Sequence, residues 1–208
     1  MKALLVIDIQ NDFLPGGSLA VPEGDQIIPL VNELMPEYPL VIATQDWHPD
    51  NHGSFAKNHP NHQIGDLIQL DGLQQILWPT HCVEGSSGAE FANNLDTQRF
   101  DHIIRKGNDP KIDSYSCFHD NGHRKTTGLA KLLKEKGVSE IHLCGLATDY
   151  CVKFTALDAL QEGFKVTLIE DATRGVNLNP NDVSNTLAHL KSKGIEILNS
   201  KELGPLLT

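Results

Sequence analysis

Residues 141–151 read IHLCGLATDYC and predict a buried strand, a glycine turn and the start of a helix. Apolar runs that do not alternate with polar residues are typical of parallel strands covered on both faces. Similar runs occur at residues 4–7, 40–43, 102–104, 166–169 and 195–198. The sequence therefore predicts a mostly parallel six-stranded sheet.

Helical patterns lie between several of these runs, at residues 25–35, 126–136, 149–163 and 180–193. Strands that alternate with helices predict an α/β fold, here a three-layer α/β/α sandwich. A chain of 208 residues is long enough for one well-packed domain and short for two. We therefore expect a single domain over residues 1–208.

The segment around residues 45–99 does not follow this alternation of strands and helices. It has few periodic signals and holds five of the ten histidines. Long irregular segments within a compact domain are usually functional or disordered, and four aromatic residues in this one make disorder a poor explanation. We interpret the segment as an insertion that binds a metal ion.

The composition excludes several classes of partner. The chain has 27 acidic and 17 basic side chains, a formal charge of -10, so neither nucleic acid nor an anionic membrane is expected as a partner. The apolar start of the chain is too short for a signal peptide and is broken by Asp8. The four cysteines lack the spacing of a disulfide framework and are expected as free thiols in the cytoplasm: Cys82, Cys117, Cys144 and Cys151.

Cys151 is the candidate nucleophile. It is expected in the first turn of the helix that follows residues 141–146, where free N–H groups and the helix dipole would lower the thiol pKa. The same N–H groups could stabilise an oxyanion. A buried cysteine that only packs the turn is the alternative, and Cys144, inside the strand, is expected to have such a core role.

Two further strand ends carry charged groups. Asp8 ends the first apolar run, and Lys106 ends the run that begins at residue 102. Since reactive groups gather at the carboxyl ends of parallel strands, both are expected near Cys151, Asp8 as a base and Lys106 as a cation that stabilises the thiolate. A turn aspartate and a surface lysine are the alternatives for each residue taken alone.

Histidines and a carboxylate suggest the metal site. Asp46, His48 and His52 follow the second apolar run within seven residues, and His81 comes later. One carboxylate and three imidazoles suit one divalent ion of zinc, iron or manganese. A histidine-rich loop without metal remains the alternative, and His59 and His62 are nearby competitors for a ligand position.

At this point the motifs resemble a known family. The chain resembles the nicotinamidases (pyrazinamidases) of the isochorismatase-like cysteine hydrolases over essentially its full length. The matching segments are DIQNDFLPGGSL at residues 8–19, TQDWHPDNHGSF at 44–55, WPTHC at 78–82, RKG at 105–107 and GLATDYC at 145–151. The resemblance implies hydrolysis of nicotinamide to nicotinate and ammonia through a cysteine thioester, a step of NAD salvage, with pyrazinamide as a further substrate.

The resemblance also implies roles for single residues. Asp8, Lys106 and Cys151 would form the catalytic triad, and Asp46, His48, His52 and His81 would bind the metal. A cis peptide would join Leu146 to Ala147, and the amides of Ala147 and Cys151 would form the oxyanion hole. Substrate-binding positions would be Phe13, Trp78, Tyr115 and Ala147. Members of the family range from monomers to larger assemblies, so a homo-oligomer is compatible with the resemblance.

Two other functions are compatible with the sequence. In the first, the metal activates water for attack on an amide and Cys151 is only structural. In the second, the chain is a non-catalytic ligand-binding protein on the same scaffold, although such a protein would be expected to have lost Asp8, Lys106 or Cys151. Turnover by a variant without Cys151 separates the first from the thioester route, and ammonia release tests the second.

Overall fold

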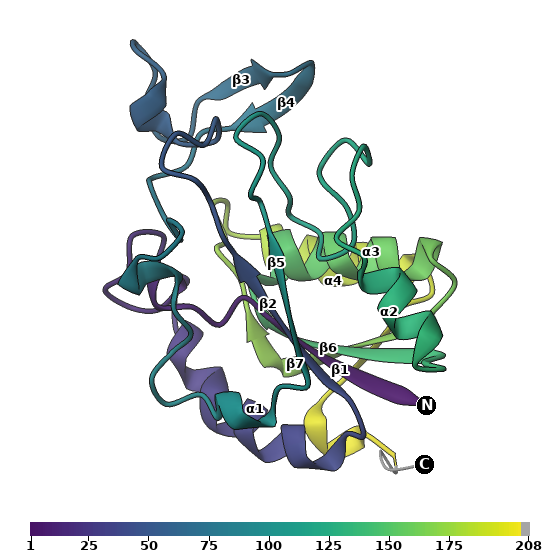
Figure 1. Cartoon of the computed structure of the whole chain (residues 1–208). Coiled ribbons are helices and arrows are strands. Elements are labelled where there is room, and N and C mark those ends of the chain that lie inside the picture. The colour runs from purple at the N-terminus through teal and green to yellow at the C-terminus, as the bar shows by residue number, and fades with distance from the viewer. Residues whose placement is uncertain (205–208) are drawn as a thin grey trace.

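The protein has a three-layer α/β/α architecture, seen here in a computed structural model that describes residues 1–204 (Figure 1). Residues 205–208, the end of the predicted domain, lie outside the described residues. The central six-stranded sheet has the order β5-β2-β1-β6-β7-β8, and every neighbouring pair is parallel. Its strands are β1 (Lys2–Ile7), β2 (Val41–Asp46), β5 (His102–Lys106), β6 (Glu140–Leu146), β7 (Lys165–Arg174) and β8 (Glu196–Leu198). The predicted fold class is confirmed.

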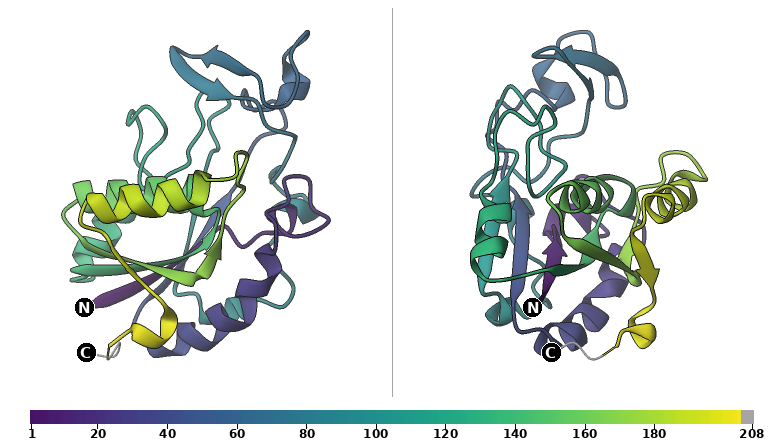
Figure 2. Two further views of the ribbon diagram at one scale, coloured as in Figure 1. Left: turned by 180° about the vertical axis from the view of Figure 1, so that it is seen from behind. Right: turned by 90° about the vertical axis from the view of Figure 1, so that its right-hand side faces the viewer.

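Helices cover both faces of this sheet, as Figure 2 shows from two sides. Alternate residues of β1 face opposite ways: Leu4 and Val6 pack in the core on one face, and Leu5 and Ile7 pack in the core on the other. The first face is covered by α1 (Ile28–Leu34). The second is covered by α2 (Leu129–Glu135), α3 (Lys153–Gln161) and α4 (Asp182–Ser192). Burial on both faces explains why the strands read as unbroken apolar runs.

The helix predicted over residues 149–163 begins differently from the expectation. Thr148–Val152 forms one π-helical turn before α3, and Ala147 occupies the N-cap position without a side-chain cap. The side chain of Asp149 does not cap this turn and accepts hydrogen bonds from the backbone N–H groups of Val176 and Asn177. Cys151 therefore lies in a π turn rather than in the first turn of an α-helix.

Part of the irregular segment forms a small hairpin of its own. Strands β3 (Leu67–Leu70) and β4 (Leu73–Ile76) pair antiparallel and project beyond the end of the main sheet (Figure 1). Buried side chains elsewhere in the segment include those of Phe55, Trp78 and His81. None of the helices in residues 1–204 is long and apolar enough to cross a membrane.

Candidate active site

The site lies where the direction of strand addition reverses. Along the chain, β2 and β5 follow β1 and lie on one side of it, whereas β6 follows them and lies on the other side. Ligand crevices form at such points, where the strand order reverses. Lys106 ends β5 directly opposite Asp46, which ends β2. Asp8 follows β1, and Cys151 follows β6. Four adjacent strand ends thus supply four of the predicted site residues.

Lys106 is the centre of this group, and its side chain is fully buried. Its ammonium donates hydrogen bonds to Asp46 Oδ1, to the backbone oxygen of Ser114 at 3.1 Å and to Cys151 Sγ at 3.4 Å. Asp8 Oδ2 lies 2.9 Å from the same nitrogen but receives no hydrogen bond within the described chain. The lysine is therefore not a surface residue, and the predicted trio is brought together.

Burial and neighbouring charges shift the pKa values of Lys106 and Asp46 in opposite directions. Burial alone would lower the pKa of Lys106, but the charges of Asp46 and Asp8 outweigh it and raise this pKa well above its usual value. Burial alone would raise the pKa of Asp46, but Lys106 and His48 outweigh it and hold this pKa far below its usual value. Both shifts favour the ionised form of each group.

Asp8 differs from Asp46 although both contact the same lysine. It is fully buried, and the net effect of burial is a raised pKa, which Lys106 and the hydroxyl of Thr44 only partly offset. Thr44 Oγ1 donates a hydrogen bond of 2.6 Å to Asp8 Oδ1. Oδ2 is thus the oxygen left to accept a proton, which suits a general base.

The prediction of a lowered thiol pKa at Cys151 is wrong in this arrangement. Burial raises the pKa of Cys151 well above its usual value, and the opposing effect of Lys106 does not compensate for it. The carboxylates of Asp8 and Asp46 add to the increase, and their oxygens lie within 4.8 Å of Sγ. The resting thiol therefore keeps its proton and needs a base when it reacts.

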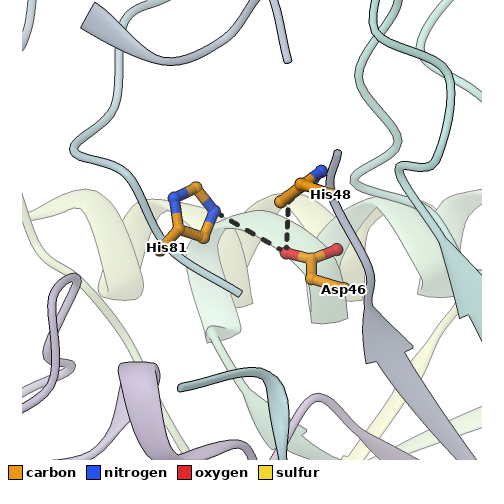
Figure 3. A group of neighbouring side chains, drawn as sticks. All are labelled: Asp46, His48 and His81. Atoms are coloured by element: carbon orange, nitrogen blue, oxygen red, sulfur yellow. Dashed lines mark ion pairs between the residues drawn. The ribbon is translucent and has the colours of Figure 1, made fainter. Parts of the chain in front are cut away.

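Three of the four predicted metal ligands converge, as Figure 3 shows. Asp46 Oδ2 lies 3.5 Å from His48 Nε2 and 3.9 Å from His81 Nε2. The Nδ1 atoms of the two rings point to the backbone oxygens of Gly107 and Pro79, at 2.7 and 2.8 Å. Because a carbonyl only accepts, each Nδ1 carries the proton and each Nε2 keeps its lone pair for a metal.

A glycine makes room for the ring of His48. A Cβ atom at Gly107 would lie 2.4 Å from the ring carbon Cε1 of His48, and the glycine has a φ of +68°. His48 Nε2 is buried without a hydrogen-bond partner. Such an orphaned nitrogen beside a carboxylate fits a divalent cation, so the residues present suit the predicted metal.

His52, the fourth predicted ligand, belongs to an adjacent cluster. Its ring centre lies 4.4 Å from that of His48, and its Nδ1 lies 2.7 Å from Ser54 Oγ. Its possible ligand atom groups with those of His48 and Asp113 rather than with Asp46. The competitors are elsewhere: His59 Nε2 contacts the backbone oxygen of Gly53, and His62 pairs with Asp66 at the surface.

Burial favours neutral imidazoles at two of these positions. Burial and the neighbouring His48 lower the pKa of His81 to about 4, and burial lowers the pKa of His52. At His48 burial also acts to lower the pKa, but Asp46 outweighs it and raises the value. A metal ligand must be deprotonated, so His52 and His81 are ready to bind a cation at neutral pH.

A pocket opens beside Cys151. Its walls include all four residues predicted to contact substrate, Phe13, Trp78, Tyr115 and Ala147. Trp78 Nε1 donates a hydrogen bond of 3.0 Å to the Tyr115 hydroxyl, which fixes two aromatic walls together. The peptide between Leu146 and Ala147 is cis, as the resemblance implied. Asp46 and His81 border the same pocket, so metal ligands and thiol share one space.

The sequence interpretation missed several residues that build the site. Gln10 pins the backbone of Asp46 with two hydrogen bonds of 2.9 and 2.8 Å, and Thr44 holds Asp8. Asp113 lines the pocket from the loop after β5. Gln10 and Thr44 lie within the motifs at residues 8–19 and 44–55, and these motifs are the sequence signal for them. Nothing in the sequence around Asp113 distinguishes it from a loop carboxylate.

Comparison with known proteins gives the family. A family model described as "Isochorismatase domain" matches residues 2–202. The nicotinamidase of Escherichia coli K12 is 47% identical over 93% of this chain and 92% of its own. A solved nicotinamidase/pyrazinamidase of Acinetobacter baumanii has a TM-score of 0.94 and 46% identity, covering 98% of both chains.

A solved structure also bears on the metal. The pyrazinamidase of Pyrococcus horikoshii, in complex with zinc, has a TM-score of 0.77 and 42% identity, and the match covers 95% of this chain and 98% of that one. The match of the family model and the identity to these relatives establish the family. The chain belongs to the isochorismatase family.

Proposed function

We propose that this protein is a nicotinamidase, which hydrolyses nicotinamide to nicotinate and ammonia through a thioester on Cys151. The observation that carries the proposal is the position of one buried ammonium, 3.4 Å from Cys151 Sγ and 2.9 Å from Asp8 Oδ2. The similar E. coli and A. baumanii proteins are both named nicotinamidases, which supports nicotinamide as the substrate. The A. baumanii protein is also named a pyrazinamidase, which supports pyrazinamide as a further substrate.

In the first half-reaction Asp8 acts as the base. Its Oδ2 accepts the proton of the Cys151 thiol, and the sulfur forms a bond to the amide carbon of nicotinamide. The backbone N–H groups of Ala147 and Cys151 would hold the oxyanion, and one such donor contributes about 3 kcal/mol in comparable sites. Asp8 then passes its proton to the amide nitrogen, ammonia leaves and a nicotinoyl thioester remains.

In the second half-reaction a water molecule replaces ammonia. Asp8 accepts a proton from this water, whose oxygen attacks the thioester carbon, and the carbon–sulfur bond breaks to release nicotinate. The proton on Asp8 returns to the sulfur. Lys106 stays charged throughout and stabilises first the carboxylate of Asp8 and then the departing thiolate.

The aromatic walls and the metal site would orient the substrate. Phe13, Trp78 and Tyr115 offer flat apolar surfaces to the pyridine ring. Asp46, His48 and His81, with His52 beside them, would hold one divalent ion of zinc, iron or manganese. The chemistry that such an ion would supply is that of a Lewis acid, which would help to position the ring nitrogen of the substrate. Orientation of this kind can account for a large part of a rate enhancement.

The wider proposal concerns organisation and location. We propose that residues 1–208 form one domain with a metal-binding insertion around 45–99, because Asp46 and His81 from that segment line the same pocket as Cys151. The four cysteines are free, which fits a reducing compartment, and we propose the cytoplasm. Nicotinamide is the proposed partner, and formation of a homo-oligomer remains a prediction.

Replacement of the nucleophile tests the thioester route. Cys151→Ala should abolish ammonia release from nicotinamide, and Cys144→Ala, in the buried strand β6, should retain it. Intact-protein mass spectrometry during turnover should find a nicotinoyl adduct on the native chain and on the Cys144 variant only. Full amidase activity in the Cys151 variant would instead favour water activated by the metal, and no turnover of nicotinamide or related amides by the native chain would favour a binding protein.

A further inference from the structure

Asp113 is a buried carboxylate to which the mechanism assigns no role. It lies in the loop between β5 and α2, its exposed fraction is 4%, and it lines the pocket beside Cys151. Its oxygens accept hydrogen bonds from two neutral donors, the backbone N–H of Ser114 at 2.8 Å and Gln75 Nε2 at 3.2 Å. Within residues 1–204 no Lys, Arg or His nitrogen lies within ion-pair distance of it, whereas Asp8 and Asp46 share Lys106.

The nearest candidate partners of Asp113 are imidazoles. One carboxylate oxygen of Asp113 and one nitrogen each of His48 and His52 all lie within 4.8 Å of one another. Two ligands that are each about 2.1 Å from an ion can be at most about 4.2 Å apart, so a small movement would bring the three onto one cation. His52 Nε2 is fully buried and has no hydrogen-bond partner in the described chain.

The charge of the buried site leads to the same conclusion. Three carboxylates, Asp8, Asp46 and Asp113, are buried with one ammonium, that of Lys106. Counted at their formal charges, three carboxylates and one ammonium leave two negative charges that Lys106 does not compensate. Buried charges are costly unless they are paired or coordinate a metal, and one divalent cation would restore neutrality.

We propose that Asp113 is a second carboxylate of the metal centre, which holds a divalent cation together with His48 and His52 as well as Asp46 and His81. The inference rests on the proposed metal site and adds a ligand that the motif around residues 46–52 does not contain. It also gives the loop after β5 a function, since Asp113 would connect this loop to the insertion through the cation.

The test measures metal affinity rather than activity. Asp113→Asn keeps the size of the side chain and removes its charge. It should weaken Zn²⁺ binding, measured in competition with a chromogenic chelator, by at least the about 10- to 100-fold that loss of an outer-shell partner costs. The Co²⁺-loaded variant should also show altered visible absorption. The matched control is Asp120→Asn, a buried carboxylate of the same loop that accepts hydrogen bonds from Gly122, Arg124 and Lys125, and it should bind Zn²⁺ as the native chain does.

The outcomes separate this inference from the proposed metal site. Native affinity and an unchanged Co²⁺ spectrum in Asp113→Asn would overturn it, provided that His48→Ala has lost the metal. Equal weakening in the Asp120 variant would also overturn it, because the loop rather than the charge would then matter. If His48→Ala binds Zn²⁺ normally, the proposed metal site itself fails. Should Asp113→Asn not fold, Asp113→Glu serves, and its unaltered Co²⁺ spectrum would contradict the assignment.

Discussion

Lys106 is the residue on which the site's electrostatics depend. Within residues 1–204 it is the single ammonium beside two buried carboxylates and a buried thiol, and each of these groups would be costly to ionise without it. Its position follows from the register of β2 and β5, which sets it opposite Asp46. A lysine in this setting serves folding and chemistry together, so its replacement should affect both.

Replacement of Lys106 with Met should lower the rate of ammonia release by at least about 100-fold, because Asp8 and Cys151 lose the charge that stabilises their ionised forms. Loss of one partner from a buried ionic group should also reduce the free energy of unfolding by about 3–5 kcal/mol. Steady-state assays and urea unfolding measure the two effects. Lys125→Met, which removes an exposed partner of Asp109, should change neither. A native rate in Lys106→Met would exclude the proposed role.

The buried His81 should make the metal-free protein sensitive to acid. Its pKa is about 4 in the fold and 6.5 when unfolded, so between these values the unfolded chain binds more protons. Stability is therefore present above pH 6.5 and is lost as the pH falls towards 4, by about 2 kcal/mol at pH 4.5 from this side chain. Urea unfolding of metal-free protein at pH 7 and pH 4.5 measures the loss.

The variant His81→Asn isolates that contribution from the other titrating groups. It should lose about 2 kcal/mol less stability than the native chain between the two pH values. His189→Asn, on the exposed side of α4, should behave as the native chain does. An equal loss in His81→Asn and the native chain would show that His81 is not held neutral by the fold.

At the residue scale, the sequence predicted which side chains lie together better than it predicted their pKa values. Asp8, Lys106 and Cys151 were expected to lie together because each ends or follows a strand run, and strand ends converge by topology. The direction of the Cys151 pKa was predicted wrongly, because burial and the nearby carboxylates depend on side chains from other strands. Asp113 was missed for the same reason, since its loop has no periodic pattern and its neighbours are distant in sequence.

At the element scale, the strands were predictable because burial on both faces leaves an unbroken apolar run. The structure places strands at all six predicted runs, and β7 extends to Arg174, beyond the predicted end at residue 169. The helix predicted over residues 180–193 is shorter in the structure, where α4 spans Asp182–Ser192. The π turn at Thr148–Val152 was not predictable, because local propensity does not distinguish it from an α-helical turn.

Close contact between β1 and β6 can be tested at Gly145. Its φ is +111°, and an added Cβ would lie 2.1 Å from the backbone oxygen of Ile7, so Gly145→Ala must separate the two strands. We expect a loss of about 3 kcal/mol or more in the free energy of unfolding. Gly163→Ala is the matched control, since its φ is +91° but no atom lies within 4 Å of the added carbon.

The control should cost only about 1 kcal/mol, from backbone conformation alone. Urea unfolding gives both values. Because β1 and β6 lead directly to Asp8 and Cys151, Gly145→Ala should also lower activity in the fraction that stays folded. Equal losses of stability in the two variants would mean that the approach of the strands is not tight and that only the positive φ matters.

At the scale of the whole molecule, the metal ligands connect parts of the chain that the sheet alone does not join. Asp46 belongs to β2, whereas His48, His52 and His81 lie in the segment that also carries the β3–β4 hairpin. A cation held by these residues would tie that segment to the main sheet. Binding that occurs only in the folded state adds to stability by mass action.

Removal of the metal should therefore lower the melting temperature. For a cation at 1,000 times its dissociation constant, the stabilisation lost is about 4 kcal/mol, and for a chain of this size that corresponds to about 8–16 °C. Thermal unfolding followed by circular dichroism, before and after treatment with a chelator, measures the shift, and added Zn²⁺ should reverse it. His48→Ala should melt near the metal-free value and should not respond to either treatment. If a sample that elemental analysis shows to be stripped of metal melts at the same temperature as the loaded protein, the ligands do not connect these segments through a bound ion.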